Sequence, residues 1–315
     1  MSLSGVLRRL GGGLAVLWLV SIVTFGLVQL IPGDAAEAAA GEYATREDVE
    51  VIRSRMGLDE PLLTQYWTWI THALQGNLGT SLQTGESATH LILQAAPATF
   101  SLTGLAIVMA ILVGVPSGTV AGLHQGRRLD SLVTTLATAG IAMPSFVLLM
   151  PLLYVFAQAR HWLPATGYVP LSAGPGPWLS HLVLPAATLA LAVAAELARH
   201  TRGSVVDVLS RPYIRTAESR GMPTGWLVRH HVLRNSAIPV VTVLGLEAGR
   251  LLGGAIVIES VAGISGLGNL AVTAVRQRDY PTLQAFVLFV ATVIVVINLL
   301  VDLTYAWINP KVRAK

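Results

Sequence analysis

The sequence predicts an all-α, polytopic membrane protein with six transmembrane helices. Of its 315 residues, 53% are hydrophobic and only 12% are charged, whereas a soluble domain carries roughly 25% charged residues. Apolar runs long enough to span a bilayer, which takes about 20 helical residues, recur along the chain. The few charged residues could not cover the surface of a soluble domain of this length, so the membrane class is favoured.

Each of the six spans corresponds to one apolar run. We expect them at roughly 10–31, 98–122, 132–157, 181–199, 236–258 and 284–307, with the fourth the shortest. Pro144, Pro151 and Pro185 are expected to kink their helices, which membrane helices tolerate. The first run follows two arginines, as a signal peptide would, but it exceeds a signal-peptide core of about 7–15 residues. We therefore expect a retained helix there.

Positive charge predicts the orientation of these spans. The N-terminal arginines, Arg127 and Arg128, the segment 199–235 and the C-terminal tail would all lie on one side of the membrane, whereas the 32–97 loop has more acids than arginines. Cytoplasmic loops are enriched in lysine and arginine, so both termini are expected in the cytoplasm. The cations lie beside apolar segments, which favours this interpretation over a nucleic-acid partner. The absence of cysteine excludes a disulfide framework and a thiolate zinc site.

Two patterns concern packing outside and inside the spans. The stretch LTQYWTWITHAL (63–74) predicts a helix lying against the membrane or the bundle, with a simple spacer as the alternative. Gly114, Gly118 and Gly122 recur every four residues in the second span and predict close helix packing.

The segment 200–235, between the fourth and fifth spans, is predicted to contain a short helix. Pro212 can open a helix at its first position, and Gly221 can end it in the left-handed conformation. Thr224 follows Pro223 and begins a second helix that returns the chain to the membrane. Such a capped helix suits docking. On the residues alone, an ordinary cytoplasmic loop enriched in arginine remains the alternative.

This segment resembles the cytoplasmic EAA loop of permeases in binding-protein-dependent ABC importers. Ala217 and Gly221 match the motif, followed by His231-x-Leu233-Arg234-Asn235-x3-Pro239. The form RTA-x3-G is typical of the peptide, nickel and glutathione branch. Collinear segments also resemble that branch, including MGLDEPLLTQYWTWI (56–70), MPSFVL (143–148), LPAATLAL (184–191) and NLLVDLTYAWINPKVR (298–313). ISGLG (264–268) departs from the family's frequent Pro-Gly pair, which leaves the detail of that loop open.

The resemblance identifies the chain as similar to the B-type permease subunit of the oligopeptide/dipeptide/nickel family. It implies a type I ABC importer permease (MetI-like) fold with an N-terminal transmembrane helix at 1–32 and an extracytoplasmic region with short helices at 33–96. A transmembrane domain at 97–308 would contain the coupling loop 200–235, and a cytoplasmic tail would follow at 309–315. Implied partners are a homologous second permease, two ATPase subunits and a solute-binding protein, in a bacterial inner membrane.

The resemblance also implies which residues act and what is carried. The chain has no G-x4-G-K-[ST] loop, so ATP and Mg²⁺ are expected on the partner ATPases, with no enzyme activity, cofactor or metal in this chain. The residues expected to couple to the ATPases are Tyr213, Ile214, Arg215, Ala217, Glu218, Gly221, Met222, His231, Arg234 and Asn235. Di- or oligopeptides are the expected cargo, and nickel, glutathione or another small solute is the alternative.

Charges inside the spans form a second group of candidates, because such charges are costly and often functional. Glu247 and Arg250 lie three residues apart in the fifth span, where one helical face can pair them. They either line the translocation path or neutralise each other at a helix interface. Glu196 and Arg199 suggest a boundary pair, and Asp302 a structural hydrogen-bond acceptor. Glu247 keeps an ion-coupled secondary transporter as a rival, whereas an intramembrane serine protease lacks a G-x-S-x-G motif.

Overall fold

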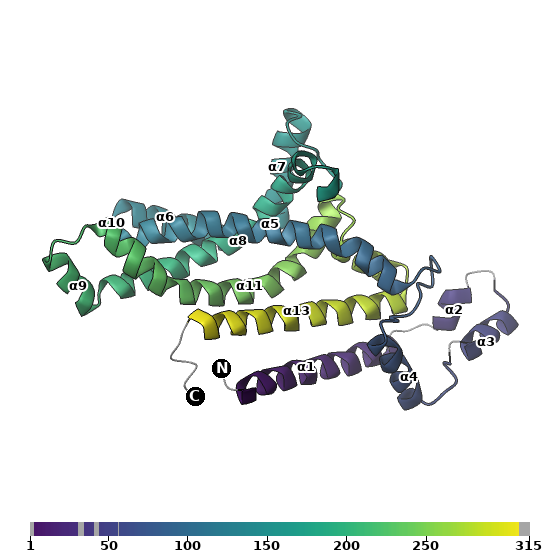
Figure 1. Ribbon diagram of the computed structural model, residues 1–315. Coiled ribbons are helices and arrows are strands. Elements are labelled where there is room, and N and C mark those ends of the chain that lie inside the picture. The colour runs from purple at the N-terminus through teal and green to yellow at the C-terminus, as the bar shows by residue number, and fades with distance from the viewer. Residues whose placement is uncertain (1–2, 31–34, 41–43, 56, 309–315) are drawn as a thin grey trace. The chain divides into compact units, whose positions relative to one another are not determined.

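The computed structural model describes residues 3–30, 35–40, 44–55 and 57–308. Within these ranges the chain is helical (Figure 1), without strands and with one isolated bridge between Thr80 and Ser87. The α-helices are α1 (Leu3–Leu30), α2 (Ala35–Ala40), α3 (Arg46–Arg55), α4 (Leu62–Leu74), α5 (Ala88–Leu123), α6 (Arg128–Ala142), α7 (Ser145–Leu152), α8 (Pro175–Leu209), α9 (Pro212–Ser219), α10 (Thr224–Leu227), α11 (Leu233–Ala262), α12 (Leu267–Arg276) and α13 (Tyr280–Ile308). Short helical turns lie at η1 (Leu153–Ala159), η2 (Leu171–Ala173) and η3 (Val228–Val232). The predicted all-α class is confirmed.

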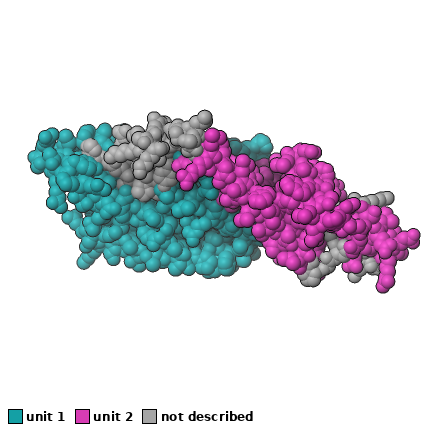
Figure 2. Space-filling view, turned by 90° about the horizontal axis from the view of Figure 1, so that it is seen from below, with its two compact units in different colours: residues 1–2, 99–264, 297–315 teal, residues 3–98, 265–296 magenta. Residues whose placement is uncertain are grey.

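The chain divides into two compact units, which Figure 2 shows in different colours. Unit 1 comprises residues 1–2, 99–264 and 297–315, and unit 2 comprises residues 3–98 and 265–296. The division therefore falls inside α5 and inside α13. Each unit is described by itself.

The predicted spans are found, but one of them is broken. Among the described residues, five helices are long and apolar enough to cross a membrane: α1, α5, α8, α11 and α13. The third expected span instead consists of two helices, 128–142 and 145–159, bent by 98° at their junction, and they make the sixth span only if counted together. Met143 and Pro144 are extended at this break, because proline lacks an N–H and disfavours a helical residue before it.

The fourth span differs from its prediction in length. We expected the shortest helix, at 181–199, whereas α8 runs for 35 residues and is among the longest that the structure describes. Pro185 is buried inside it and does not end it. The extension matters for function, because α8 continues directly to the segment that carries α9.

In unit 1, helices α6, α7 and α11 pack against α8, and α9 and α10 lie beyond the same end of α8 and α11 (Figure 1). The predicted glycine row of α5 also faces α8 of the same chain. A Cβ on Gly114 would lie 2.5 Å from the carbonyl oxygen of Ala194, and one on Gly122 would lie 2.6 Å from a methyl of Val205. The row is therefore a close-packing face, as the sequence predicts, and it joins two helices of one chain.

Unit 2 contains the predicted helix of the 63–74 stretch, which is α4. It packs on α1, where the hydroxyls of Ser21 and Tyr66 are 2.8 Å apart and the ring of Phe25 meets that of Tyr66 edge to face. A second contact joins the segment after α4 to the start of α13: the buried carboxylate of Asp279 accepts hydrogen bonds from the hydroxyl of Ser81 at 2.5 Å and the amide of Leu82 at 3.1 Å. The 33–96 region is therefore structured, and the spacer alternative is excluded for its described residues.

Candidate functional site

The short helix α9 has the start and the end that the sequence predicts. Pro212 is its first residue, and Gly221 adopts a φ of +79° just after it. The amide of Met222 donates to the carbonyl of Ala217 at 3.2 Å, the longer hydrogen bond of a glycine-terminated helix end. No atom would lie within 4 Å of a Cβ on Gly221. The glycine is therefore required by the backbone conformation rather than by crowding within this chain.

One residue fixes α9 to the rest of unit 1. The side chain of Ile214 is fully buried and packs with Val205 and Val208 of α8 and with Val232 of η3. Ile214 is one of the residues expected to couple to an ATPase, but its side chain has no exposed surface with which to contact a partner. Its contacts are those of an anchor within this chain, so any part that it takes in coupling is indirect.

The other side of α9 is exposed. Tyr213 is 46% exposed and Met222 is 36% exposed, Arg215, Arg220 and Gly221 are exposed as well, and Ala217 is half-buried. Neither Arg215 nor Arg220 forms an ion pair with any side chain that the structure describes. The exposed face thus presents an aromatic ring, a thioether and two guanidinium groups beside the glycine turn, a surface suited to a protein partner with acidic residues.

The remaining predicted coupling residues all lie in helices. Glu218 lies in α9, His231 in η3, and Arg234 and Asn235 in α11. The positions of their side chains lie outside the described part of the chain. The neighbouring His230 stacks on Trp226, with ring centroids 4.6 Å apart, and Leu227 beside them is buried. The second helix predicted from Thr224 is therefore α10, which continues through η3 into α11.

An ion pair that the sequence did not reveal joins α8 to α6 near the end of α8 that leads to α9. Arg202 of α8 donates through Nε and one terminal nitrogen to the carboxylate of Asp130, the first-turn acid of α6. Asp130 is 5% exposed and also accepts from the amide of Gly126 at 2.9 Å. The two residues are 72 positions apart, so no local pattern links them, and only the position of Asp130 just after an arginine pair could have drawn attention to it.

The candidate pathway residues come together as the helical spacing predicts. Arg250 donates to Glu247 at 2.8 Å within α11. Glu196 of α8 accepts from Arg199 at 2.5 Å and lies 3.2 Å from a ring nitrogen of His200. Glu196, His200, Glu247 and Arg250 line one cavity of about 670 Å³ between α8 and α11. Glu196 thus pairs with Arg199 as the sequence suggested, and it also lines this cavity.

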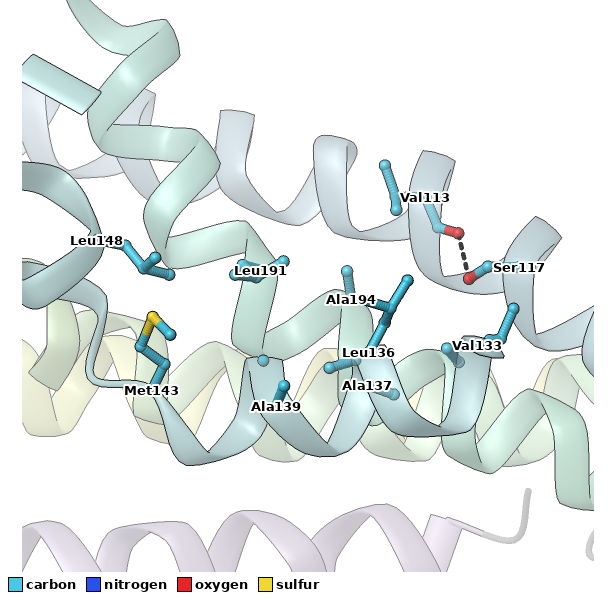
Figure 3. Close-up of a pocket in the computed structure, with 13 residues that line it drawn as sticks. Val113, Ser117, Val133, Leu136, Ala137, Ala139, Met143, Leu148, Leu191 and Ala194 are labelled. Carbon is cyan, nitrogen blue, oxygen red and sulfur yellow. Dashed lines mark hydrogen bonds between the residues drawn. The ribbon is translucent and has the colours of Figure 1, made fainter. Parts of the chain in front are cut away.

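A second cavity in unit 1 is apolar. It has a volume of about 380 Å³ and lies among α5, α6, α7 and α8, where side chains such as Leu136, Met143, Leu148 and Leu191 surround it (Figure 3). Its one hydroxyl, that of Ser117, donates to the carbonyl of Val113 at 2.7 Å. This cavity offers no charged group for recognising a polar solute, so the charged cavity is the stronger candidate for a solute path. Among the described residues, no group of histidine and acidic side chains could hold a metal ion.

Comparison with known proteins places this architecture in a family. Residues 114–314 match the family described as binding-protein-dependent transport system inner membrane component, and residues 2–103 match its N-terminal region. The chain is 42% identical to the glutathione transport system permease protein GsiC of Escherichia coli K12, over 99% of this chain and all of that protein. It is 39% identical to a probable peptide ABC transporter permease of Sinorhizobium fredii, over 98% of each chain.

Solved structures agree on the fold. An inward-facing structure of the MetNI methionine ABC transporter covers 70% of this chain and 97% of its own, with a TM-score of 0.57 and 14% sequence identity. A structure of an amino acid ABC transporter with histidines covers 69% and 94%, with a TM-score of 0.51 and 19% identity. The chain is thus a multi-pass membrane protein, and it belongs to the family of binding-protein-dependent ABC transporter permeases.

Proposed function

We propose that this chain is one permease subunit of an importer for di- or oligopeptides, and that α9 couples it to ATPase subunits. The observation that carries the coupling role is the geometry of α9. Ile214 anchors the helix to α8 and η3, while the opposite face is open beside the glycine turn. A rigidly anchored helix can pass a displacement of a bound partner to α8 and α11, whereas a flexible loop would absorb it. ATP and Mg²⁺ would bind to the partners.

The partners and the orientation form part of the same proposal. The translocation path would be completed by a homologous second permease, and an extracytoplasmic binding protein would deliver the solute. Both termini and α9 would lie on the cytoplasmic side of a bacterial inner membrane, as the arginine distribution supports. Coupling must be reciprocal at equilibrium: if ATP favours one arrangement of the permease, docking of the loaded binding protein must favour the matching state of the ATPases.

Peptides are the proposed cargo, and glutathione is the second candidate. The relatives named above are a probable peptide permease and a glutathione permease of nearly equal similarity. Glutathione is itself a modified tripeptide, so the two proposals share an ammonium group, carboxylates and amide bonds.

The test is uptake by the assembled transporter in proteoliposomes. This chain, its partner permease and its ATPases should take up a labelled dipeptide or glutathione only when ATP and the loaded binding protein are present. The chain reconstituted alone should take up neither. Uptake by the chain alone under an ion gradient would overturn the proposal in favour of the secondary-transporter alternative.

A further inference from the structure

The charged cavity between α8 and α11 contains both signs of charge and is lined by residues of two membrane-spanning helices. Its lining includes Glu196 and His200 from α8 and Thr242, Glu247 and Arg250 from α11. Glu247 lies inside the membrane-spanning stretch 240–262 of α11, seven residues from its start, about 10 Å at 1.5 Å per residue. Glu196 and Arg250 line the same cavity, one from α8 and the other from α11. The cavity therefore joins a carboxylate of α8 with an ion pair of α11.

Exposure distinguishes the two partners of that ion pair. The side chain of Glu247 is 11% exposed, whereas that of Arg250 is 76% exposed. A pair that only neutralised charge between two packed helices would bury both partners. An exposed guanidinium in a membrane span is costly against lipid, so such groups face a water-filled path or another polar surface. Arg250 thus has donors directed away from Glu247 and available to a further acceptor.

We propose that this cavity is a selectivity site of the translocation path for small solutes that carry both an ammonium and a carboxylate group. The inference rests on the proposed transport function and adds the part of the solute that this chain recognises. The guanidinium of Arg250 binds the carboxylate of the solute in the two-pronged geometry that arginine offers. Glu196 and Glu247, from opposite sides of the cavity, bind the ammonium group.

Charge balance explains why a doubly charged solute fits best. Glu247 is compensated by Arg250, and Glu196 by Arg199. A zwitterion exchanges these pairs for equivalent ones and leaves the net charge of the site unchanged. A solute with only one charge leaves an unpaired charge within the span, which is strongly unfavourable. The site therefore discriminates against solutes with either end blocked.

The test compares substitutions inside and outside the cavity in the assembled, ATP-driven transporter. Proteoliposomes containing the wild-type chain or Arg250→Gln are given labelled dialanine, dialanine amide and glutathione. The same binding protein delivers every solute, so a change in preference between variants reports the permease. We expect Arg250→Gln to lower dialanine uptake relative to dialanine amide by at least about tenfold, because the variant loses the charge-assisted hydrogen bonds to the carboxylate.

Arg160→Gln is the matched control. Arg160 is an exposed arginine of the same unit whose guanidinium lies over the ring of Trp162, and it does not line the cavity, so its substitution should change the preference by less than about twofold. Arg250→Lys keeps the charge without the two-pronged geometry, and it should shift the preference in the same direction by less. This variant decides the question if Arg250→Gln does not assemble.

The double substitution Glu247→Arg with Arg250→Glu separates recognition from simple neutralisation. This double variant keeps an ion pair at the two positions but moves the guanidinium away from position 250. Its preference between dialanine and dialanine amide should therefore stay altered, as in Arg250→Gln. Recovery of wild-type preference in the double variant, or equal behaviour of Arg250→Gln and Arg160→Gln, would overturn the selectivity site while the transport function stands. Absence of dialanine and glutathione uptake in the wild type would instead refute the proposed cargo, and the selectivity site with it.

Discussion

Arg202 and Asp130 form a two-pronged ion pair that ties α8 to the start of α6, seven residues before α8 ends. The same carboxylate accepts from the amide of Gly126, so the turn between α5 and α6 is held to α8 as well. Because α8 leads directly to α9, a displacement of α9 would reach three helices together rather than bend one of them. The pair is the described contact best placed to stiffen the base of the proposed coupling helix.

Removing either partner should destabilise the chain, but not equally. Arg202→Gln leaves the carboxylate of Asp130 buried without its cation, whereas Asp130→Asn leaves an arginine whose side chain is 31% exposed and can reach water. We expect a loss of about 2–3 kcal/mol for the first substitution and about 1 kcal/mol for the second. Thermal unfolding of the purified transporter in detergent measures both. A larger effect of Asp130→Asn would contradict this account of the burial.

The glycine turn after α9 should matter more than a nearby glycine in open space. Gly221 has a φ of +79°, which a β-branched residue adopts only with strain, whereas Gly225 has no such conformation. Neither would place a Cβ within 4 Å of another atom. Gly221→Val should therefore abolish stimulation of ATP hydrolysis by the loaded binding protein and lower uptake at least tenfold, with normal amounts in the membrane. Gly225→Val should keep most of both activities, and equal loss in the two variants would count against the turn.

The anchor and the exposed face of α9 can be separated by two alanine substitutions. Ile214→Ala removes a fully buried side chain and should cost about 2–4 kcal/mol locally, so α9 should become mobile. Tyr213→Ala removes a half-exposed ring and should leave α9 ordered while weakening the docking of an ATPase. The sequence contains no cysteine, so a single cysteine at the exposed Ser219 takes a spin label specifically. Its spectrum should narrow with Ile214→Ala and not with Tyr213→Ala; the reverse pattern would show that Tyr213 is the anchor.

Some of these features follow from local sequence, and others require the fold. The limits of α9 were predictable because Pro212 and Gly221 act through their own backbone restrictions. The face on which Ile214 lies was not, because an eight-residue helix shows an apolar side without indicating whether its own chain or a partner covers it. The break at Met143 and Pro144 was seen only as a kink, since hydropathy records apolar length and not direction. The pairing of Asp130 with Arg202 depends on two distant helices, and no local pattern connects them.

The same distinction applies to the charged cavity. The spacing of Glu247 and Arg250 predicts their pairing, because residues three apart share a helical face. That Glu196 lies across from them depends on the packing of α8 on α11. Hydropathy alone ended α8 at Arg199. The part beyond it has contacts that hydropathy does not record: Arg202 pairs with Asp130 of α6, and Val205 lies against Gly122 of α5.

Two glycines of α5 should respond differently to substitution by alanine: one substitution should lower the stability of the protein, and the other should leave it unchanged or raise it. A Cβ on Gly118 would lie 2.9 Å from the Cα of Ala198 and 2.9 Å from the Cβ of Thr201, both on α8, whereas Gly104 has nothing within 4 Å. Gly118→Ala should force α5 away from α8 and lower stability by about 1–3 kcal/mol. Gly104→Ala should be neutral or raise stability by up to about 1 kcal/mol, because alanine favours the helix. Thermal unfolding of the two variants measures the difference, and a stabilising Gly118→Ala would show that α5 and α8 are not in close contact there.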